Sequence, residues 1–105
     1  MSEEASVEKL PGGIWRLSGE LTFATVPRLV ESTGPELDAR QGVLKIDLEG
    51  VSRADSAGLV LLIGWLRRAR RQGVRILFCK VPEQLLKIAR VSGLESVLPF
   101  DSGVE

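Results

Sequence analysis

The chain has 105 residues, of which 44% are hydrophobic, 27% are charged and 5% are aromatic. A chain of this length and composition makes one globular domain. Fourteen Lys and Arg residues balance fourteen Asp and Glu residues, so the net charge gives no reason to expect nucleic acid or an anionic membrane as a partner. No repeat or linker divides the sequence, and only residues 1–5 and 101–105 are expected to fray.

The residue types that the chain lacks exclude several kinds of catalytic and metal-binding site. The chain has no His, the usual general base at neutral pH and the commonest metal ligand, and Cys79 is its only Cys. Disulfides within the chain and zinc sites built from several Cys and His residues are therefore excluded. Asp47, Glu49 and Asp55 are close in sequence, but nothing fixes their spacing as a metal site. We expect a protein that is not an enzyme and that has no catalytic residue, metal or cofactor.

Three features favour a cytoplasmic protein that does not insert into a membrane. A single Cys suits a reducing compartment. The first residues, Met-Ser-Glu-Glu-Ala-Ser, are acidic and polar, unlike a secretory signal. The longest apolar run, the ten residues 57–66, is half of the ~20 residues that a membrane-spanning helix needs.

A hairpin is predicted at the start of the chain. Strands at 7–10 and 14–18 flank a turn at 11–13, Pro-Gly-Gly. The chain is then expected to leave the sheet over 17–21.

The first helix is predicted to begin after Thr25, which is placed to cap it, with Pro27 in its first turn. Gly34-Pro35 is expected to break or kink this helix before residues 36–40. The residues expected to form its apolar face are Val26, Leu29 and Val30.

From residue 43 the pattern alternates between strand and helix. Leu44, Ile46 and Leu48 share one face of the first strand, Gly73 ends the next helix, and Pro82 opens another. The predicted elements are a strand at 43–48, a helix at 57–72, a strand at 74–79, a helix from 82 to 93 and a short strand at 97–98. This β-α-β-α-β order predicts parallel strands with right-handed crossovers. Together with the hairpin it predicts an α/β fold with a mixed sheet.

The segment 51–58 follows a predicted strand, at the place where an open α/β sheet carries its functional loops. Ser56 is expected to cap the following helix through its hydroxyl, and Asp55 places a negative charge at the positive end of the helix dipole, worth ~0.3–1 kcal/mol. These structural roles alone would account for both residues. Ala57 and Gly58 carry no bulky side chain, so we expect that the backbone of another protein can approach closely here.

The helix at 57–72 has more apolar surface than one core needs. At ~100° per residue, one arc is sufficient for the core and contains Leu59, Leu62, Ile63, Leu66 and Ala69. The positions expected to face outward are Val60, Leu61, Gly64, Trp65, Arg67, Arg68 and Arg71. Apolar residues bordered by arginines are typical of an interface with a polar rim. The alternative is that Trp65 folds over the edge of the core, whereas Trp15 is expected to pack against the sheet and Cys79 to be an inert core thiol.

Basic residues are concentrated in this region. Between Arg53 and Arg75 six arginines stand against the single acid Asp55, a local balance of +5, which leaves −5 for the rest of the neutral chain. A charged partner can orient a domain of this kind within the ~8–10 Å that screening allows. The alternative is a solvated helix end.

Three motifs carry a family resemblance: Leu17-Ser18-Gly19-Glu20-Leu21, Ile46-Asp47-Leu48 and Asp55-Ser56-Ala57-Gly58-Leu59. Together they resemble the STAS domain of sulfate transporters and anti-sigma-factor antagonists. The resemblance implies a single STAS domain over residues 1–105 with its core at about 7–100. The segments 51–56, 58–59, 69–73 and 97–99 are further similar to the branch of the family found in phospholipid-transporting ABC complexes.

That branch implies a small subunit without catalytic groups, at the cytosolic face of the inner membrane, in a transporter that maintains outer-membrane lipid asymmetry. Such a subunit binds the transporter's ATPase directly and its permease through the complex. The residues expected to bind the partner are Asp55, Ser56, Ala57, Gly58, Val60, Leu61, Gly64, Trp65 and Arg68. A further alternative is that two copies of the chain associate through an exposed patch around Trp65.

An anti-sigma-factor antagonist is the alternative function. In antagonists regulated by phosphorylation, the phosphorylated serine directly precedes the motif glycine, but this chain has Ala57 there, which cannot accept phosphate. Ser56 matches the neighbouring hydroxyl position. Phosphate on Ser56 would add about −1.5 to −2 charge beside Asp55, an unfavourable placement.

Overall fold

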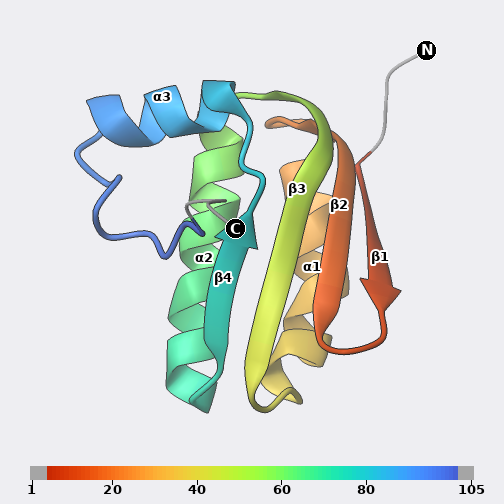
Figure 1. The fold of residues 1–105 in the computed structure, drawn as a ribbon. Helices are drawn as coiled ribbons and strands as arrows, with labels where there is room; N and C mark the ends of the chain where they lie inside the picture. The colour runs from red at the N-terminus through yellow and green to blue at the C-terminus, as the bar shows by residue number, and fades with distance from the viewer. Residues whose placement is uncertain (1–4, 102–105) are drawn as a thin grey trace.

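The computed structural model describes residues 5–101, which form a four-stranded sheet and three helices (Figure 1). The elements in chain order are β1 (Ser6–Leu10), β2 (Ile14–Leu21), α1 (Val26–Asp38), β3 (Val43–Ala54), α2 (Ser56–Gln72), β4 (Arg75–Cys79) and α3 (Glu83–Val91). The strands lie in the order β1-β2-β3-β4. β1 and β2 form the predicted antiparallel hairpin, and β2, β3 and β4 run parallel. The predicted α/β fold with a mixed sheet is confirmed.

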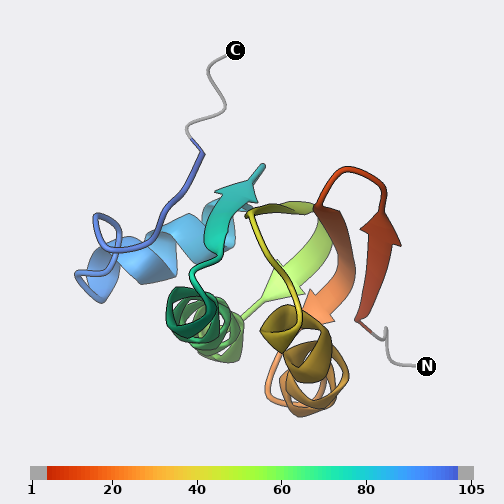
Figure 2. The same cartoon turned by 90° about the horizontal axis from the view of Figure 1, so that it is seen from below.

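Both helices that connect parallel strands lie against the same face of the sheet (Figure 2). The residues that point into this layer from the strands are fully buried, among them Trp15, Leu44, Ile46 and Leu48. The predictions for Trp15 and for the buried face of β3 are therefore confirmed. α2 contacts β4, α1 and α3, so it has neighbours on several sides.

β2 and β3 stay paired beyond their predicted ends. The chain does not leave the sheet over 17–21, and residues 51–54 belong to β3, so both predictions of loop structure were wrong. Two shifts in register keep the strands paired. A Cβ at Gly50 would lie 2.9 Å from the carbonyl oxygen of Leu17, so glycine allows this close approach. The predicted loop shrinks to Asp55.

α1 is one continuous helix, and the predicted break at Gly34-Pro35 does not occur. Pro35 deprives the Glu31 carbonyl of its helical partner, and because Glu31 is exposed, water can take the place of the missing N–H. Leu29 and Leu37 are buried on either side of the proline and hold both halves of the helix against the core.

The short strand predicted at 97–98 does not form. Its place is taken by a single parallel bridge between Phe78 of β4 and Phe100. The backbone N–H groups of Val97 and Leu98 bond to the carbonyl oxygen of Leu94, which folds this segment into a turn and leaves it unable to pair with β4.

Asp55, and not Ser56, caps α2. Asp55 has an extended backbone, and its Oδ1 accepts the N–H of Ala57 at 2.8 Å. Ser56 is already the first helical residue, so the predicted cap was wrong by one position. The predicted end of the helix is confirmed, because Gly73 lies in the left-handed region with φ 73°.

Trp65 lies inside the molecule. Its indole Nε1 donates to Thr33 Oγ1 of α1 at 2.8 Å, and Thr33 Oγ1 donates in turn to the Leu29 carbonyl at 2.7 Å. The Trp65 ring stands edge-on to Trp15 of β2, with ring centroids 5.9 Å apart. Trp65 is 2% exposed and Leu61 is 1% exposed, so the outward orientation predicted for both was wrong, and the alternative that Trp65 packs over the core is confirmed. α1 covers this side of α2, which the period of one helix does not reveal.

The Trp65–Thr33 hydrogen bond predicts a coupled effect on stability. Thr33→Val leaves a buried indole N–H without a partner, and we expect it to lower the free energy of unfolding by about 1–3 kcal/mol. Trp65→Phe removes the donor and part of a buried ring. In the double variant no donor is left unpaired, so the combined loss should be smaller than the sum of the single losses. Urea denaturation measures all four proteins, with Val91→Thr at a 90% exposed position as the control. Additive losses would contradict the coupling.

The cap predicts different effects at neighbouring residues. Asp55→Ala removes the acceptor for the Ala57 N–H and should lower the free energy of unfolding by about 0.5–2 kcal/mol. Ser56→Ala removes an exposed hydroxyl and should change it by less than about 0.5 kcal/mol. Thermal and urea unfolding of the two variants check this, and the reverse ranking would return the cap to Ser56.

Candidate functional site

The carboxyl ends of β2 and β3 meet the amino ends of α1 and α2 at one edge of the sheet, at the top of Figure 1. The Asp55 N–H donates to the Leu21 carbonyl at 3.0 Å and joins the two connections. Thr25 does not cap α1 with its side chain. Instead its hydroxyl donates to the Glu20 carbonyl at 2.6 Å and accepts the Thr22 N–H at 3.0 Å. These bonds hold the first turns of both helices at the same edge.

Ser56 is the part of this edge that is open to solvent. It is exposed, and within residues 5–101 its hydroxyl makes no hydrogen bond. Because Asp55 carries the capping role, the Ser56 hydroxyl is left available at the positive end of the α2 dipole. Asp55 is therefore a half-buried helix cap, whereas Ser56 is an exposed polar residue.

Ala57 and Gly58 serve the protein's own core. Both are buried, so the predicted close approach of another backbone to them was wrong. A Cβ at Gly58 would lie 3.2 Å from the Leu21 Cβ and 3.3 Å from Leu85 Cδ2 of α3. The glycine is needed because α2 packs tightly at this point between β2 and α3.

A groove of about 350 Å³ runs between α1 and α2. Its apolar lining is Val30 and Gly34 from α1, and Val60, Leu61, Gly64 and Trp65 from α2. The buried Leu61 and Trp65 form its floor, whereas Val60 is 62% exposed and Gly64 is exposed at its side. Of the four apolar positions predicted to face outward, Val60 and Gly64 are confirmed as exposed.

Arginines complete the lining of the groove on the α2 side. Arg68 donates from Nε and Nη2 to the two carboxylate oxygens of Asp38 in α1, at 3.1 and 2.7 Å. These bonds hold the pKa of the Asp38 carboxyl below its ordinary value and raise the pKa of the Arg68 guanidinium. Arg67 and Arg71 also line the groove, and within residues 5–101 neither forms an ion pair.

Two residues near Ser56 and the groove, Phe23 and Val30, are apolar and exposed although the sequence analysis did not predict their exposure. Phe23 is 70% exposed and precedes α1 at the edge that carries Ser56. Val30 was expected in the core face of α1 but is 44% exposed and lines the groove. Its spacing of four residues from Gly34 is a signal that both lie on one side of the helix.

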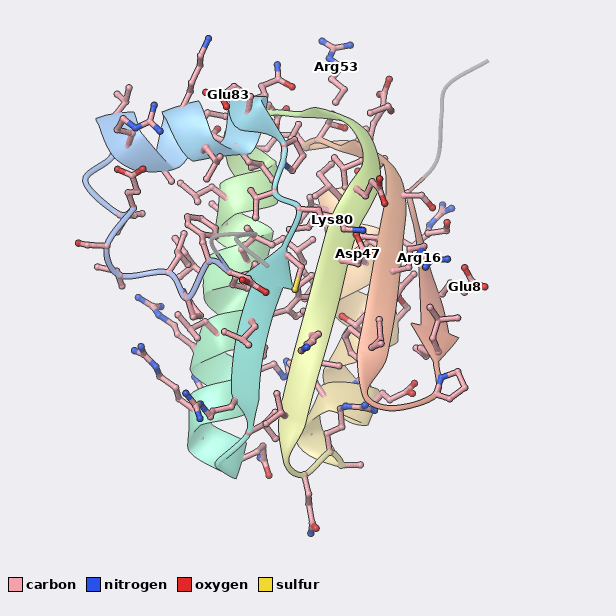
Figure 3. All side chains as sticks on the ribbon, viewed as in Figure 1. Glu8, Arg16, Asp47, Arg53, Lys80 and Glu83 are labelled. Carbon is pink, nitrogen blue, oxygen red and sulfur yellow. The ribbon has the colours of Figure 1, made fainter. Side chains whose placement is uncertain are left out.

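The three acids that were weighed as metal ligands, Asp47, Glu49 and Asp55, make other contacts in the structure. Asp47 lies 3.8 Å from Arg16 Nε on the sheet face away from α1 and α2, and Glu49 Oε1 lies 3.4 Å from Lys80 Nζ. Figure 3 shows Arg16, Asp47 and Lys80 gathered on this polar face. Asp55 is the cap of α2. Within residues 5–101 no group of three His, Cys, Asp or Glu residues is placed to hold a metal ion.

Cys79 is partly buried at the end of β4. Burial raises the pKa of its thiol, and the neighbouring Asp101 carboxylate raises it further. The thiol is therefore protonated at neutral pH and is a poor nucleophile, as predicted, but Cys79 is not the core residue that was expected. None of the helices between residues 5 and 101 combines the length and the hydropathy that a membrane span requires.

Known proteins share this fold and its sequence pattern. A family model described as "Mlab, STAS domain" matches residues 12–99. The anti-sigma-B factor antagonist of Staphylococcus aureus is 28% identical over 90 residues, which cover 86% of this chain and 83% of that protein.

Two solved structures extend the likeness to the fold. An anti-sigma factor antagonist from Mycobacterium paratuberculosis matches 98% of this chain and 88% of its own, with a TM-score of 0.75 and 22% identity. A sulfate transporter family protein from Wolinella succinogenes matches 92% of this chain and 83% of its own, with a TM-score of 0.68 and 19% identity. Since the family model spans most of the sequence and these folds agree with the one described above, the chain belongs to the STAS domain family.

Proposed function

We propose that this STAS domain is a non-catalytic accessory subunit of an ABC transporter that moves phospholipid between membranes, in the manner of MlaB. Its direct partner is then an ATPase of the MlaF type, and it reaches a permease of the MlaE type through that ATPase at the cytosolic face of the inner membrane. The description of the matching family model supports this branch.

The observation that carries the proposal is the difference in exposure between Ala57 and Ser56 at the start of α2. The position that precedes the motif glycine is the buried Ala57, which offers no hydroxyl to a kinase, while Ser56 stands exposed beside it. A phosphorylation switch at the usual position is therefore missing, but a surface for stable protein contact is kept. That pattern suits a constitutive subunit better than a partner-switching regulator.

The proposed contact surface follows one stripe of α2. Ser56, Val60 and Gly64 are exposed at intervals of four residues, which places them on one side of the helix, and Arg68 continues the row. Asp55 holds the start of this stripe. The other predicted contact residues lie directly beneath it and support its shape: Ala57, Gly58, Leu61 and Trp65.

An anti-sigma-factor antagonist is the second candidate function. The 28% identical relative from Staphylococcus aureus and the Mycobacterium structure favour it. Both functions use one fold, so the test must address binding and phosphorylation separately.

Val60→Asp should weaken the complex with the ATPase. Val60 is 62% exposed and makes no contribution to the core, so the variant should fold normally. A charge in an apolar contact should lower the affinity about tenfold or more. Biolayer interferometry with the purified ATPase and far-UV circular dichroism measure the two effects. Val91→Asp, the same change at a 90% exposed position of α3, is the control. Equal affinity for both variants would remove Val60 from the contact.

The two candidate functions differ in their response to a kinase. We expect incubation with ATP and the anti-sigma kinase of the same cell to leave the intact mass of the protein unchanged, because Ala57 has no hydroxyl and Ser56 lies next to the Asp55 carboxylate. Mass spectrometry reads the result directly. One phosphate per chain, lost again in Ser56→Ala, would favour the regulatory function.

A further inference from the structure

The groove between α1 and α2 has a shape and a charge that select one kind of occupant. We propose that it binds an acidic amphipathic helix presented by the partner. This inference rests on the proposed function for the identity of the protein that carries the helix, but its basis is the lining of the groove.

The shape of the groove favours a helix. Two helices that start at the same edge and pack against each other form its sides, and Leu61 and Trp65 lie at the bottom, almost inaccessible to solvent. Its volume of about 350 Å³ has room for a few side chains but not for a whole helix. A helix lying along the groove would insert one apolar stripe against Val30 and Val60, the usual arrangement when a helix is bound in a groove.

Gly64 opens the α2 side of the groove. A glycine inside a helix costs roughly 0.5–1 kcal/mol relative to alanine. Gly58 is needed by the fold because its Cβ would be crowded, whereas a Cβ at Gly64 would have no other heavy atom within 4 Å. The fold of this chain therefore gains nothing from glycine at 64. Because position 64 has no side chain, a backbone or side chain of a partner can approach α2 closely there.

The charge of the groove favours an acidic partner. Arg67, Arg68 and Arg71 line it, and the Asp38 carboxylate, which is paired with Arg68 and also attracts Arg71, offsets one of these three charges. Positive charge is therefore in excess among the described residues of the groove. An apolar or basic segment would remove water from these cations without compensation. Glu and Asp side chains along the flank of a bound helix would offset that loss through charge-assisted hydrogen bonds.

The same residues argue against two other occupants. A second copy of the chain bound through a two-fold axis would bring a surface of the same positive charge against this one. A lipid bilayer is flat on this scale and would not reach Leu61 or Trp65 at the floor.

The test uses a fluorescein-labelled synthetic peptide of about 18 residues, roughly five helical turns, with Leu at i, i+3, i+4 and i+7 and Glu on the remaining face. A scrambled peptide of equal composition and a peptide with Lys in place of Glu are the peptide controls. Fluorescence anisotropy with the full-length protein should detect binding of the acidic peptide, weakened by salt. Neither control peptide should bind with comparable affinity.

Two matched pairs of variants locate the binding. Gly64→Gln adds a side chain to the groove at a position where the Cβ itself meets no other heavy atom within 4 Å, and it should weaken peptide binding about tenfold or more, whereas Val91→Gln on α3 should not. Arg67→Glu combined with Arg71→Glu should weaken it similarly. Arg70→Glu combined with Arg75→Glu makes the same charge change at exposed positions outside the groove and should have an effect of no more than about twofold.

The outcomes separate this inference from the proposed function. Peptide binding that is absent, or that all variants share, would overturn the inference, and so would binding of phosphatidylglycerol vesicles or self-association that Gly64→Gln abolishes while the peptide fails to bind. Affinity for the ATPase that Gly64→Gln leaves unchanged would also overturn it, although the proposed function would stand. Selective peptide binding by a protein that does not bind the ATPase would support the groove and reject the proposed function.

Discussion

The burial of Trp65 between α1, α2 and the sheet sets how these three parts of the molecule pack together. The indole of Trp65 touches Trp15 of the sheet and donates to Thr33 of α1, so one side chain connects the three elements that enclose the core. A buried indole N–H without an acceptor is costly, and the Thr33 hydroxyl accepts that of Trp65 while donating onward to a helix carbonyl. The buried Nε1 of Trp15, in contrast, has no hydrogen-bond partner among residues 5–101. The two helices are therefore held at a fixed separation, and the groove between them is a consequence of that separation.

The surface of α2 is limited by its neighbours. Because β4, α1 and α3 all contact this helix, a single stripe from Ser56 through Val60 and Gly64 remains exposed. The arginines that continue the stripe place positive charge beside apolar residues at the end opposite Ser56. The result is a surface with two different ends, a polar hydroxyl at the helix start and a cationic rim near its finish, which suits a partner that binds in one orientation.

The start of α2 shows how a motif with several small residues divides structural and functional work. Asp55 satisfies the backbone, Gly58 admits the neighbouring strand and helix, and Ala57 is buried between them. Ser56 differs from these three residues because its side chain is exposed and forms no hydrogen bond within residues 5–101. The proposed function assigns recognition at this edge to Ser56, the residue whose removal costs the fold least.

The fold class can be predicted from the residue pattern, because period-two and period-3.6 patterns with short connections leave few topologies other than a mixed α/β sheet. The sequence also predicts the buried face of β3, the end of α2 at Gly73 and the absence of histidine chemistry. The position of Pro35 inside a continuous helix depends on tertiary packing, because Leu29 and Leu37 hold both sides of it on the core. The burial of Trp65 likewise depends on tertiary packing, because the apolar period of α2 records how many faces are covered but not which element covers each one. The second apolar side of α2, predicted from sequence to be an interface, is mostly the contact with α1, and of its four apolar positions Val60 and Gly64 are exposed.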